Sequence, residues 1–261
     1  MRVKVFLVVW IGLGFFSIAL ESQTWSALKR LTWNADDSYE QAIAADSGNR
    51  IHVVWRNNTS GNPEIFYKRS TNRGTDWSAL TRMTWNTGYS DYPAITTDSG
   101  SGIHVVWNDD TPGNNEIFYK RSTDSGANWG ALTRLTWNAD DSYEPSIAAG
   151  SSNDIHVVWH NDTSNEIFYK QSTNGGNSWS APTRLTWNAR SSSCPSIAAD
   201  SGNGIHVVWY ELFPGNGEIF YKRSTDNGAN WSAPIRLTWN AGTSNNPSIA
   251  VDSGNGIHVI W

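Results

Sequence analysis

The chain has 261 residues, of which only 16% are charged, and it contains 16 Trp and 22 Gly residues. Many aromatic residues together with many glycines are typical of short strands joined by tight turns. The formal net charge is −5 and the basic residues never form a run longer than two, so the charge gives no reason to expect a nucleic-acid partner. These properties exclude a nucleic-acid partner from our expectations and favour one large all-β domain.

The first residues differ from the rest of the chain. Arg2 and Lys4 precede an apolar stretch at 5–20, in which Ser17 and Ala19 are small residues near its end. This is the layout of a secretory signal peptide, and an uncleaved anchor is the alternative. We therefore predict a signal peptide at 1–22 and a mature chain at 23–261 that is secreted or held at the cell surface. We expect no membrane insertion after cleavage.

Three short strings recur along the mature chain. Leu-Thr-Trp-Asn or a close variant places Trp at 33, 85, 137, 187 and 239, and Ile-His-Val-Val-Trp or a close variant ends at 55, 107, 159, 209 and 261. Both series advance by 52, 52, 50 and 52 residues. Glu-Ile-Phe-Tyr-Lys begins at 64, 116, 166 and 218. A fixed period of this length indicates a repeat architecture.

Each repeat contains the pattern of four short strands. In the second repeat these are a small apolar strand at 94–97, a β-branched run at 103–107, an alternating strand at 116–122 and a longer polar strand at 129–137. Gly, Asn, Asp, Ser and Pro fill the gaps, as turns require. Four strands in about 50 residues indicate a β-propeller blade. We predict an all-β propeller of four-stranded antiparallel blades, four of them complete and a fifth incomplete.

An octapeptide between the third and fourth strands gives the most specific signal. Ser122–Trp129 resembles the Asp box of sialidase-like propellers, and so does Ser224–Trp231, whereas Ser70–Trp77 and Ser172–Trp179 carry Asn in place of Asp. The Asp or Asn is expected to cap the turn, the Gly to adopt a positive φ and the Trp to be buried. The structural residues expected from this turn are Asn72, Gly74, Trp77, Asp124, Gly126, Trp129, Asn174, Gly176, Trp179, Asp226, Gly228 and Trp231.

The two ends of the repeat region are out of phase with the blades. Residues 25–34 match an outermost strand, whereas the last repeat has only two inner strands, at 247–251 and 256–261. Propellers use such an offset to close the ring. Because the last repeat has no third strand, we expect either a longer native chain or a five-bladed ring with a defective fifth blade.

Two classes of loop are expected to share one face, with the Asp boxes on the other. The resemblance places the sialidase active site on this loop face. The strands repeat almost verbatim while these loops differ, which is either ordinary surface tolerance or adaptation to a ligand. Carboxylates and aromatic rings suit sugar hydroxyls and sugar ring faces. The ligand-binding candidates are Asp36, Asp37, Tyr39, Arg56, Tyr89, Tyr92, Asp109, Asp110, Asp140, Asp141, Tyr143, Asp162, Arg190, Tyr210 and Glu211.

The repeated polar and aromatic residues are interpreted as structural. The five His residues of the Ile-His-Val-Val-Trp strings are expected to be hydrogen-bonded in the core, and the Glu of each Glu-Ile-Phe-Tyr-Lys string to bond within its blade. All the repeated tryptophans are expected in the core. Cys194, the only cysteine, is expected in a loop without a nucleophilic role. We expect no cofactor, with Ca²⁺ at a pair such as Asp109-Asp110 as the alternative.

The resemblance to sialidases also allows a test for catalysis. A sialidase needs three arginines, a Tyr–Glu pair and an acidic Asp, but the predicted loop face has only Arg56 and Arg190. Nearly identical blades favour repeated shallow sites instead. We therefore predict a monomeric, secreted, non-catalytic propeller that recognises glycans or other surface polymers, with no catalytic residues. An exo-α-sialidase and a structural or adhesion domain are the alternatives.

Overall fold

The computed structural model describes residues 6–8, 17–19, 27–33, 37–58, 61–188, 190–239 and 241–261. The chain divides into two compact units, Met1–Trp33 and Asn34–Trp261. In the first unit, strands β1 (Phe6–Val8) and β2 (Ser17–Ala19) pair antiparallel. In these described ranges, no helix is long and apolar enough to cross a membrane. Most of the predicted signal peptide at 1–22, and the start of the predicted strand at 25–34, lie outside the described residues.

The second unit is built from five antiparallel sheets in chain order, which we call sheets A to E. Sheets A to D have four strands each, and sheet E has two. Their bounds are β3 (Ser38–Ala45), β4 (Ile51–Asn57), β5 (Glu64–Ser70) and β6 (Thr81–Arg82) in sheet A; β7 (Ser90–Thr97), β8 (Ile103–Asp109), β9 (Glu116–Ser122) and β10 (Thr133–Arg134) in sheet B; β11 (Ser142–Ala149), β12 (Ile155–Asn161), β13 (Glu166–Ser172) and β14 (Thr183–Arg184) in sheet C; β15 (Ser192–Ala199), β16 (Ile205–Phe213), β17 (Asn216–Ser224) and β18 (Ile235–Arg236) in sheet D; and β19 (Ser248–Val251) and β20 (Ile257–Ile260) in sheet E.

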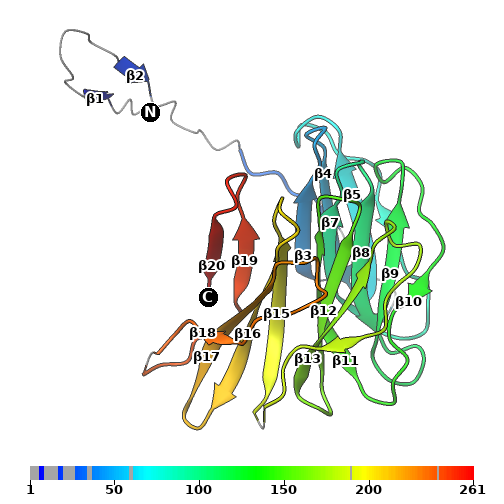
Figure 1. Ribbon diagram of the computed structural model, residues 1–261. Helices are drawn as coiled ribbons and strands as arrows, with labels where there is room; N and C mark the ends of the chain where they lie inside the picture. The colour runs from blue at the N-terminus through cyan, green and yellow to red at the C-terminus, as the bar shows by residue number, and fades with distance from the viewer. Residues whose placement is uncertain are drawn as a thin grey trace. The chain divides into compact units, whose positions relative to one another are not determined.

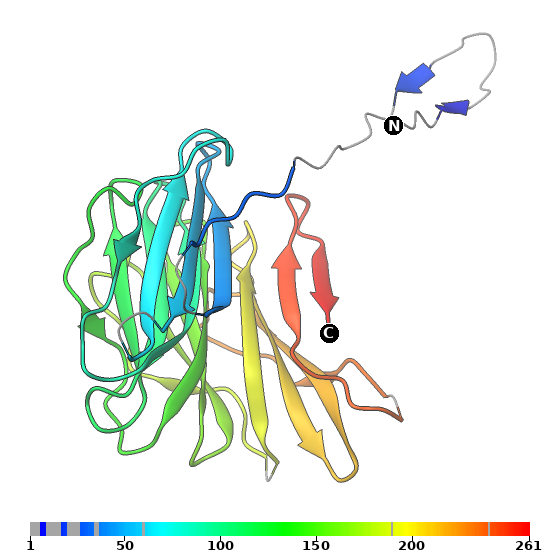
Figure 2. The ribbon, with the colours of Figure 1, turned by 180° about the vertical axis from the view of Figure 1, so that it is seen from behind.

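Consecutive sheets lie side by side and meet through their first strands. β3 contacts β7, β7 contacts β11, β11 contacts β15 and β15 contacts β19 (Figure 1). The view from behind shows the same succession, with the last hairpin, β19–β20, beside sheet D (Figure 2). The all-β prediction and its four-stranded antiparallel unit are therefore confirmed.

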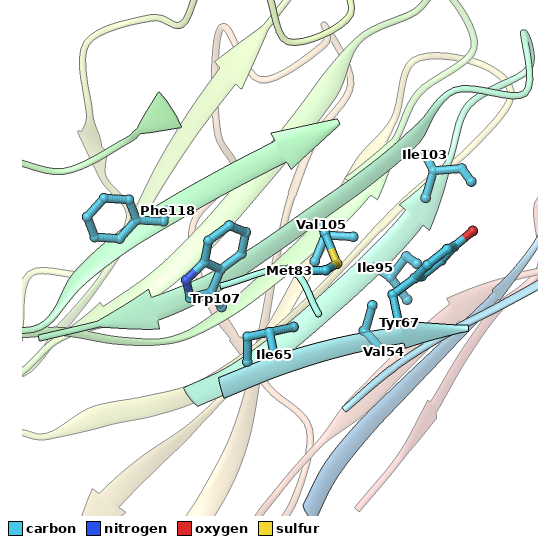
Figure 3. Packing of buried hydrophobic residues seen from close by; sticks show 9 residues of the cluster. All are labelled: Val54, Ile65, Tyr67, Met83, Ile95, Ile103, Val105, Trp107 and Phe118. Atoms are coloured by element: carbon cyan, nitrogen blue, oxygen red, sulfur yellow. The ribbon is translucent and has the colours of Figure 1, made fainter. Parts of the chain in front are cut away.

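The core lies between neighbouring sheets, because each sheet is apolar on both faces. One cluster joins Val54, Ile65 and Tyr67 of sheet A to Ile103 and Trp107 of sheet B (Figure 3). Similar clusters join sheets B and C, C and D, and D and E. A single sheet cannot hide these faces, so the repeats are stable only when they are stacked.

The His, Tyr and Trp side chains connect sheets A, B, C and D in turn. In sheet B, His104 contacts the Asp98 carboxylate at 3.0 Å and the Tyr119 hydroxyl at 2.7 Å. The Tyr119 ring meets Trp179 of sheet C edge-on, with ring centroids 5.0 Å apart. The same arrangement joins Tyr67 to Trp129 and Tyr169 to Trp231. The prediction of hydrogen-bonded His residues is thus confirmed for the buried strands.

The octapeptide turns have the predicted hydrogen bonds and glycine conformation, but their Trp side chains are half-buried and not fully buried as expected. In the turn of sheet B, the Asp124 carboxylate accepts a bond from the Asn128 amide at 2.8 Å, and the Ser122 hydroxyl accepts one from the Gly126 amide. Gly126 has φ 77°, and Gly74, Gly176 and Gly228 have φ 83°. The backbone bond from Asn128 is the largest cause that lowers the pKa of Asp124 to about 2. The Glu prediction is also confirmed, because Glu64 bonds Arg82 of its own sheet at 2.7 Å.

Two expectations about strands need correction. The outer strand expected at 129–137 is reduced to Thr133–Arg134. The reason is that hydroxyl groups replace backbone carbonyls as partners of the third strand, as when the Ile117 amide donates to Thr136 Oγ1 at 2.8 Å. The inner strand expected at 94–97 begins earlier, at Ser90, because the chain passes through a bulge between Asp91 and Ala94 and pairs again beyond it.

The expectation that all repeated tryptophans lie in the core is wrong for one of the two series. The Val-Val-Trp residues are buried in sheets A to D, with Trp107 at 1% exposure. The Leu-Thr-Trp residues are 65–70% exposed, namely Trp33, Trp85, Trp137, Trp187 and Trp239. In sheet B the fourth strand ends at Arg134, before the chain reaches Trp137, so the chain is free to turn this Trp outward.

Candidate functional site

The two classes of loop share one end of the sheets, as the sequence predicts. The loop between the second and third strands of sheet A bonds the segment that enters sheet B, because Asn62 Nδ2 donates to the carbonyls of Asn86 and Gly88 at 3.2 and 2.9 Å. In the next repeat, the Ser142 amide donates to the Asn115 carbonyl at 2.8 Å. The octapeptide turns follow the opposite ends of the third strands. The loops therefore form one joint surface across neighbouring sheets.

The first strands of sheets A to D carry a bulge at the same position, and in sheet E the equivalent residue, Asn246, lies just before β19. The bulge residue has a left-handed backbone although it is not glycine: φ is 49–52° at Glu40, Tyr92, Glu144, Cys194 and Asn246. The residue after it is proline in four of the five repeats. A proline without an N–H fits a bulge, where the ladder lacks a bond. Non-glycine residues held at positive φ are uncommon and concentrate at functional sites.

These bulges surround a depression that we call the bulge pocket. It has a volume of about 330 Å³ and is lined by the five bulge residues with their neighbours, namely Glu40, Gln41, Tyr92, Pro93, Glu144, Pro145, Ser146, Cys194, Pro195, Ser196, Asn246 and Pro247. One equivalent segment comes from each of sheets A to E. The backbone of the pocket therefore repeats five times, while its side chains differ from one bulge to the next.

Two of the bulge carboxylates connect neighbouring sheets. Glu40 Oε2 accepts a hydrogen bond from the Tyr92 amide at 3.0 Å, and Glu144 Oε2 accepts one from the Cys194 amide at 2.9 Å. Each bond satisfies the bulge amide of the next sheet and holds the carboxylate in place. Both residues line the bulge pocket, and a carboxylate has room for several donors. The two carboxylates are therefore oriented acceptors at the wall of the pocket.

A second acidic group lies beside Glu40. Asp91 precedes the bulge of sheet B, and Arg56 Nη1 lies 3.1 Å from Asp91 Oδ1 and 3.8 Å from Glu40 Oε1. Burial, followed by the hydrogen bond with Glu40 and its charge, raises the pKa of Asp91 to about 7. The pair Glu40–Asp91 therefore holds a proton near neutral pH, with Arg56 balancing the remaining charge.

Cys194 lies at the fourth bulge, within β15, and not in the loop expected from the sequence, because the strand continues through its bulge; its thiol is free. Burial, together with the nearby Glu144 carboxylate, raises the pKa of this thiol to about 11. A thiol with such a pKa stays protonated at neutral pH and is a poor nucleophile. Burial also lowers the pKa of His160, which lies on the neighbouring strand β12.

Most of the predicted ligand-binding residues that the structure describes are at least partly accessible to solvent. Asp37 and Tyr39 are exposed and joined by a hydrogen bond of 2.8 Å between the Tyr39 hydroxyl and an Asp37 oxygen. Exposed or half-buried positions on the loop end are held by Asp37, Tyr39, Arg56, Tyr89, Tyr92, Asp110, Asp140, Asp141, Tyr143, Asp162, Arg190 and Tyr210. Of these, only Tyr92 lines the bulge pocket. Asp36 lies outside the described residues.

Two candidates are corrected because their carboxylates are buried within the loops. Asp109 is 1% exposed, and its oxygens accept bonds from the Thr111 amide at 2.9 Å and the Ser90 hydroxyl at 2.7 Å. Glu211, at the equivalent position of sheet D, is 3% exposed and bonds Asn188 and Arg190. Both residues lie near the end of a second strand and organise the loop that follows, so neither is available to a ligand.

The hydrogen bonds of Asp109 and Asp110 bear on the alternative that this pair binds Ca²⁺. Asp110 Oδ1 accepts a bond from the Tyr89 amide at 2.6 Å, while the Asp109 carboxylate accepts those from Thr111 and Ser90. The two carboxylates therefore act as partners of loop amides and hydroxyls. In the part of the chain that the structure describes, no group of three or more His, Cys, Asp or Glu side chains is arranged to hold a metal ion.

Glu40, Asp91 and Glu144 are site residues that sequence reasoning misses. A signal is present in the sequence, because each bulge residue except Glu40 precedes a proline at the start of an inner strand. The residue before a proline is restricted in conformation, and four such positions in register mark a shared structural feature. Sequence reasoning selects the acidic residues of the loops instead, because the loop sequences differ more between repeats than the sequences at the starts of the strands.

The fold was compared with known proteins. No protein-family model matches the sequence, and no curated protein matches it. Among solved structures, an α-L-arabinofuranosidase from Fusarium graminearum superposes with a TM-score of 0.67 at 16% identity, covering 85% of this chain and 74% of that one. A Penicillium chrysogenum α-L-arabinanase complexed with arabinobiose gives a TM-score of 0.64 at 13% identity, with 85% and 74% covered.

Sialidases are also among the similar structures. A Hadza microbial sialidase superposes with a TM-score of 0.61 at 13% identity. The superposition covers 82% of this chain and 48% of that sialidase. The chain thus spans about half the length of that sialidase. The fold of this protein is a sialidase-like β-propeller fold, shared with arabinanases and arabinofuranosidases. At these identities the likeness establishes the fold alone.

Proposed function

We propose that this protein is a non-catalytic glycan-recognition propeller that acts outside the cell and binds its ligand in the bulge pocket. The observation that carries the proposal is the pocket itself. Five consecutive sheets contribute the same backbone position, with φ 49–52°, yet the chemical group changes from one repeat to the next although the repeats are otherwise almost identical. Divergence at a strained and structurally equivalent position favours a ligand site over simple surface tolerance.

The groups in the pocket suit a sugar. Glu40 and Glu144 are held by backbone amides, which orients them as acceptors for sugar hydroxyls. The Tyr92 ring is 39% exposed and offers an apolar face with a polar edge. Asn246 adds an amide that donates and accepts. The similar structures include an arabinanase complexed with arabinobiose, which supports a glycan as the ligand class.

Several observations favour binding without catalysis. The two arginines expected on the loop face already have acidic partners: Arg56 pairs with Asp91 at 3.1 Å and Arg190 with Glu211 at 3.3 Å. Arg190 also lies 3.9 Å from the centroid of the Phe213 ring. A sialidase needs free guanidinium groups for the carboxylate of its substrate. The Cys194 thiol stays protonated at neutral pH. The predicted signal peptide at 1–22 supports action outside the cell.

The proposal is tested by binding to a glycan array of arabino-oligosaccharides, sialylated glycans and neutral glycans, followed by calorimetry with each glycan that binds. Glu144→Gln removes the charge but keeps the shape, and we expect at least a tenfold loss of affinity, because a charged acceptor bond contributes about 1.5–3 kcal/mol. Asp76→Asn in the octapeptide turn of sheet A is the matched control. Unchanged affinity in Glu144→Gln and Tyr92→Ala would contradict the placement of the site.

Glycoside hydrolysis is the second candidate, and the Glu40–Asp91 pair is the observation that favours it. A carboxyl group with a pKa of about 7 can act as a general acid at neutral pH. Fluorogenic α-sialoside and 4-nitrophenyl α-L-arabinofuranoside substrates test this candidate. Turnover that disappears in Asp91→Asn would assign catalysis to the Glu40–Asp91 pair, of which Glu40 lines the bulge pocket. No turnover with either substrate, together with array binding, would support recognition.

A further inference from the structure

The exposed tryptophans form a second repeated feature, separate from the bulge pocket. In the second unit of the chain they are Trp85, Trp137, Trp187 and Trp239, with exposures of 69, 67, 65 and 70%. Each follows the short fourth strand of its sheet. A large apolar ring that stays two-thirds exposed in every repeat contributes little to the core. Repetition of such a ring at one structural position therefore indicates a role at the surface.

The best-defined surroundings are those of Trp137, at the junction of sheets B and C. A cavity of about 430 Å³ lies there. Its apolar lining comes from Trp137 of one sheet and from Trp159 and Phe168 of the next, whose rings stack with centroids 5.9 Å apart. Polar groups also line it, from Asn138, Asp140, Asn161, Ser164 and Lys170. We call this cavity the tryptophan cleft.

Lys170 is the buried cation of the cleft. It is 7% exposed, its Nζ donates to the Leu135 carbonyl at 2.8 Å, and it lies 5.4 Å from the centroid of the Trp137 ring. Arg134 Cζ lies 5.9 Å from the same ring, and this guanidinium is paired with Glu116. The two cations hold the indole in place by cation–π contact while most of the ring stays accessible.

The bond from a buried Lys to the carbonyl two residues before the Trp recurs at the neighbouring junctions. Between sheets C and D, Lys222 Nζ donates to the Leu185 carbonyl at 2.7 Å and lies 5.1 Å from the centroid of the Trp187 ring. Between sheets A and B, Lys120 Nζ donates at 3.3 Å to the Met83 carbonyl, in the Met-Thr-Trp string that ends at Trp85. Burial lowers the pKa of all three lysines. The chain therefore repeats the bond from Lys to a backbone carbonyl at three junctions, and the contact of the Lys with the indole ring at two of them, those of Trp137 and Trp187.

We propose that the tryptophan cleft, together with the equivalent junctions at Trp85 and Trp187, provides three binding sites, each for a single pyranose residue of a neutral polysaccharide; we call these three sites the tryptophan clefts. The apolar C–H face of the sugar stacks on the exposed indole, and its hydroxyls meet the amide, carboxylate, hydroxyl and ammonium groups around it. The cleft at Trp137 carries both an acid, Asp140, and a base, Lys170, so its charges balance and an uncharged sugar is favoured. A cavity of about 430 Å³ lies within the usual range for small ligands.

Three equal sites on a fixed scaffold bind a polymer more tightly than a single sugar. Each stacking contact is weak, but once one residue of the polymer is bound, the next binds at high effective concentration. The spacing is set by the packed sheets and does not depend on a flexible linker. The clefts are separate from the bulge pocket, and none of the residues that line the cleft at Trp137 lines that pocket.

The test uses cello-, chito-, xylo- and β-1,4-galactohexaose as probes, with titration calorimetry and ¹H–¹⁵N spectra of the indole groups. We expect at least one hexaose to bind and to shift the indole signals of Trp85, Trp137 and Trp187. The variant Trp85→Ala/Trp137→Ala/Trp187→Ala is expected to lose at least tenfold in affinity. Trp137→Ala alone should lower the stoichiometry and leave the other two indole shifts in place.

Two control variants show whether the loss of affinity comes from the clefts themselves. Ile235→Ala removes an apolar side chain of similar exposure, 53%, from outside the clefts and should bind as the parent does. Glu144→Gln alters only the bulge pocket and should leave hexaose binding unchanged, so failure of one proposal is distinguishable from failure of the other. Absence of binding by all four hexaoses, or full affinity in the triple variant, would overturn the proposal.

Discussion

The Trp129 indole meets the Tyr67 ring edge-on, with centroids 4.9 Å apart and planes at 82°. Trp129 belongs to the octapeptide turn of sheet B, and Tyr67 belongs to sheet A, where its hydroxyl bonds His52 at 2.8 Å. The turn, the ring pair and the His therefore form one continuous connection between two repeats. This explains how a motif that looks local in the sequence stabilises the contact between sheets.

The turn glycine gives the first test of this connection. Gly126 has φ 77°, and a methyl group there would overlap the Tyr67 hydroxyl. Gly126→Ala is therefore expected to lower the free energy of unfolding by about 3–5 kcal/mol, from backbone strain and overpacking together. Gly113→Ala is the matched control, because Gly113 has φ 107° with no atom near its added methyl. It should cost about 1–2 kcal/mol in urea denaturation. Equal losses of stability in Gly126→Ala and Gly113→Ala would show that the close approach of the Tyr67 hydroxyl to Gly126 has no role.

Stability should depend on pH through His156. Burial lowers the pKa of His156 to about 4 from 6.5. The unfolded chain takes up a proton below pH 6.5 and the folded chain does not, so stability is complete above that pH and falls as the pH drops toward 4. The loss should reach about 3 kcal/mol. His156→Asn keeps a polar group near the Tyr169 hydroxyl. In this variant the midpoint of urea denaturation should depend less on pH between pH 6.5 and 4.5. An equally steep dependence in both proteins would contradict this prediction.

His156 also differs from the other repeated His residues in its partners. His104 contacts Asp98 at 3.0 Å, but Gly150 takes the place of this Asp in sheet C, and His156 Nε2 is buried without a partner in the described structure. The double variant Gly150→Asp/Asp154→Gly recreates the turn of sheet B and should stabilise the protein by about 1 kcal/mol.

The single variant is the control for that exchange. Asp154 occupies the position of Gly102, where an added Cβ would overlap the Asp98 carboxylate. Gly150→Asp alone should therefore gain less than the double variant, or destabilise the protein, in thermal unfolding at pH 7. A single variant as stable as the double would contradict the predicted overlap between Asp154 and the carboxylate that Gly150→Asp introduces.

The Asp91 carboxyl has the opposite dependence on pH. Its pKa is raised to about 7, so the folded chain keeps a proton that the unfolded chain loses near pH 4. This contribution to stability is complete below pH 4 and is lost as the pH rises through 7. Asp91→Asn should stabilise the protein by about 1–2 kcal/mol at pH 8 and have little effect at pH 4. A destabilisation at pH 8 would show that the ion pair with Arg56 outweighs the burial of the carboxyl.

The repeat and its strands could be predicted because they follow from periodicity. Ile-His-Val-Val-Trp is β-branched and apolar, and the structure buries it on both faces in sheets A to D. The fate of Trp137 could not be predicted in the same way, because a Trp next to Leu-Thr looks like a core residue. Its exposure depends on hydroxyl groups, such as Thr136 Oγ1, that take the bonds of the third strand and shorten the fourth.

The candidate site is harder to derive than the fold. Asp109 looks like a loop acid in the sequence, but β8 continues to this residue and its carboxylate is buried. Glu40 and Glu144 escape notice because their role depends on a bulge that brings five distant segments together. Sequence patterns show which residues repeat, but register shifts and contacts between sheets decide where those residues point.

Whether the bulge pocket binds a glycan is best decided by chemical-shift mapping of the ¹⁵N-labelled protein titrated with arabinobiose and, separately, with the glycan bound best on the array. We expect the largest shifts at the amides of Tyr92, Glu144 and Cys194 around the bulge pocket, with little change at Asp124 and Asp226 in the octapeptide turns. Shifts concentrated in those turns would place the ligand on the opposite face and contradict a glycan site at the bulges.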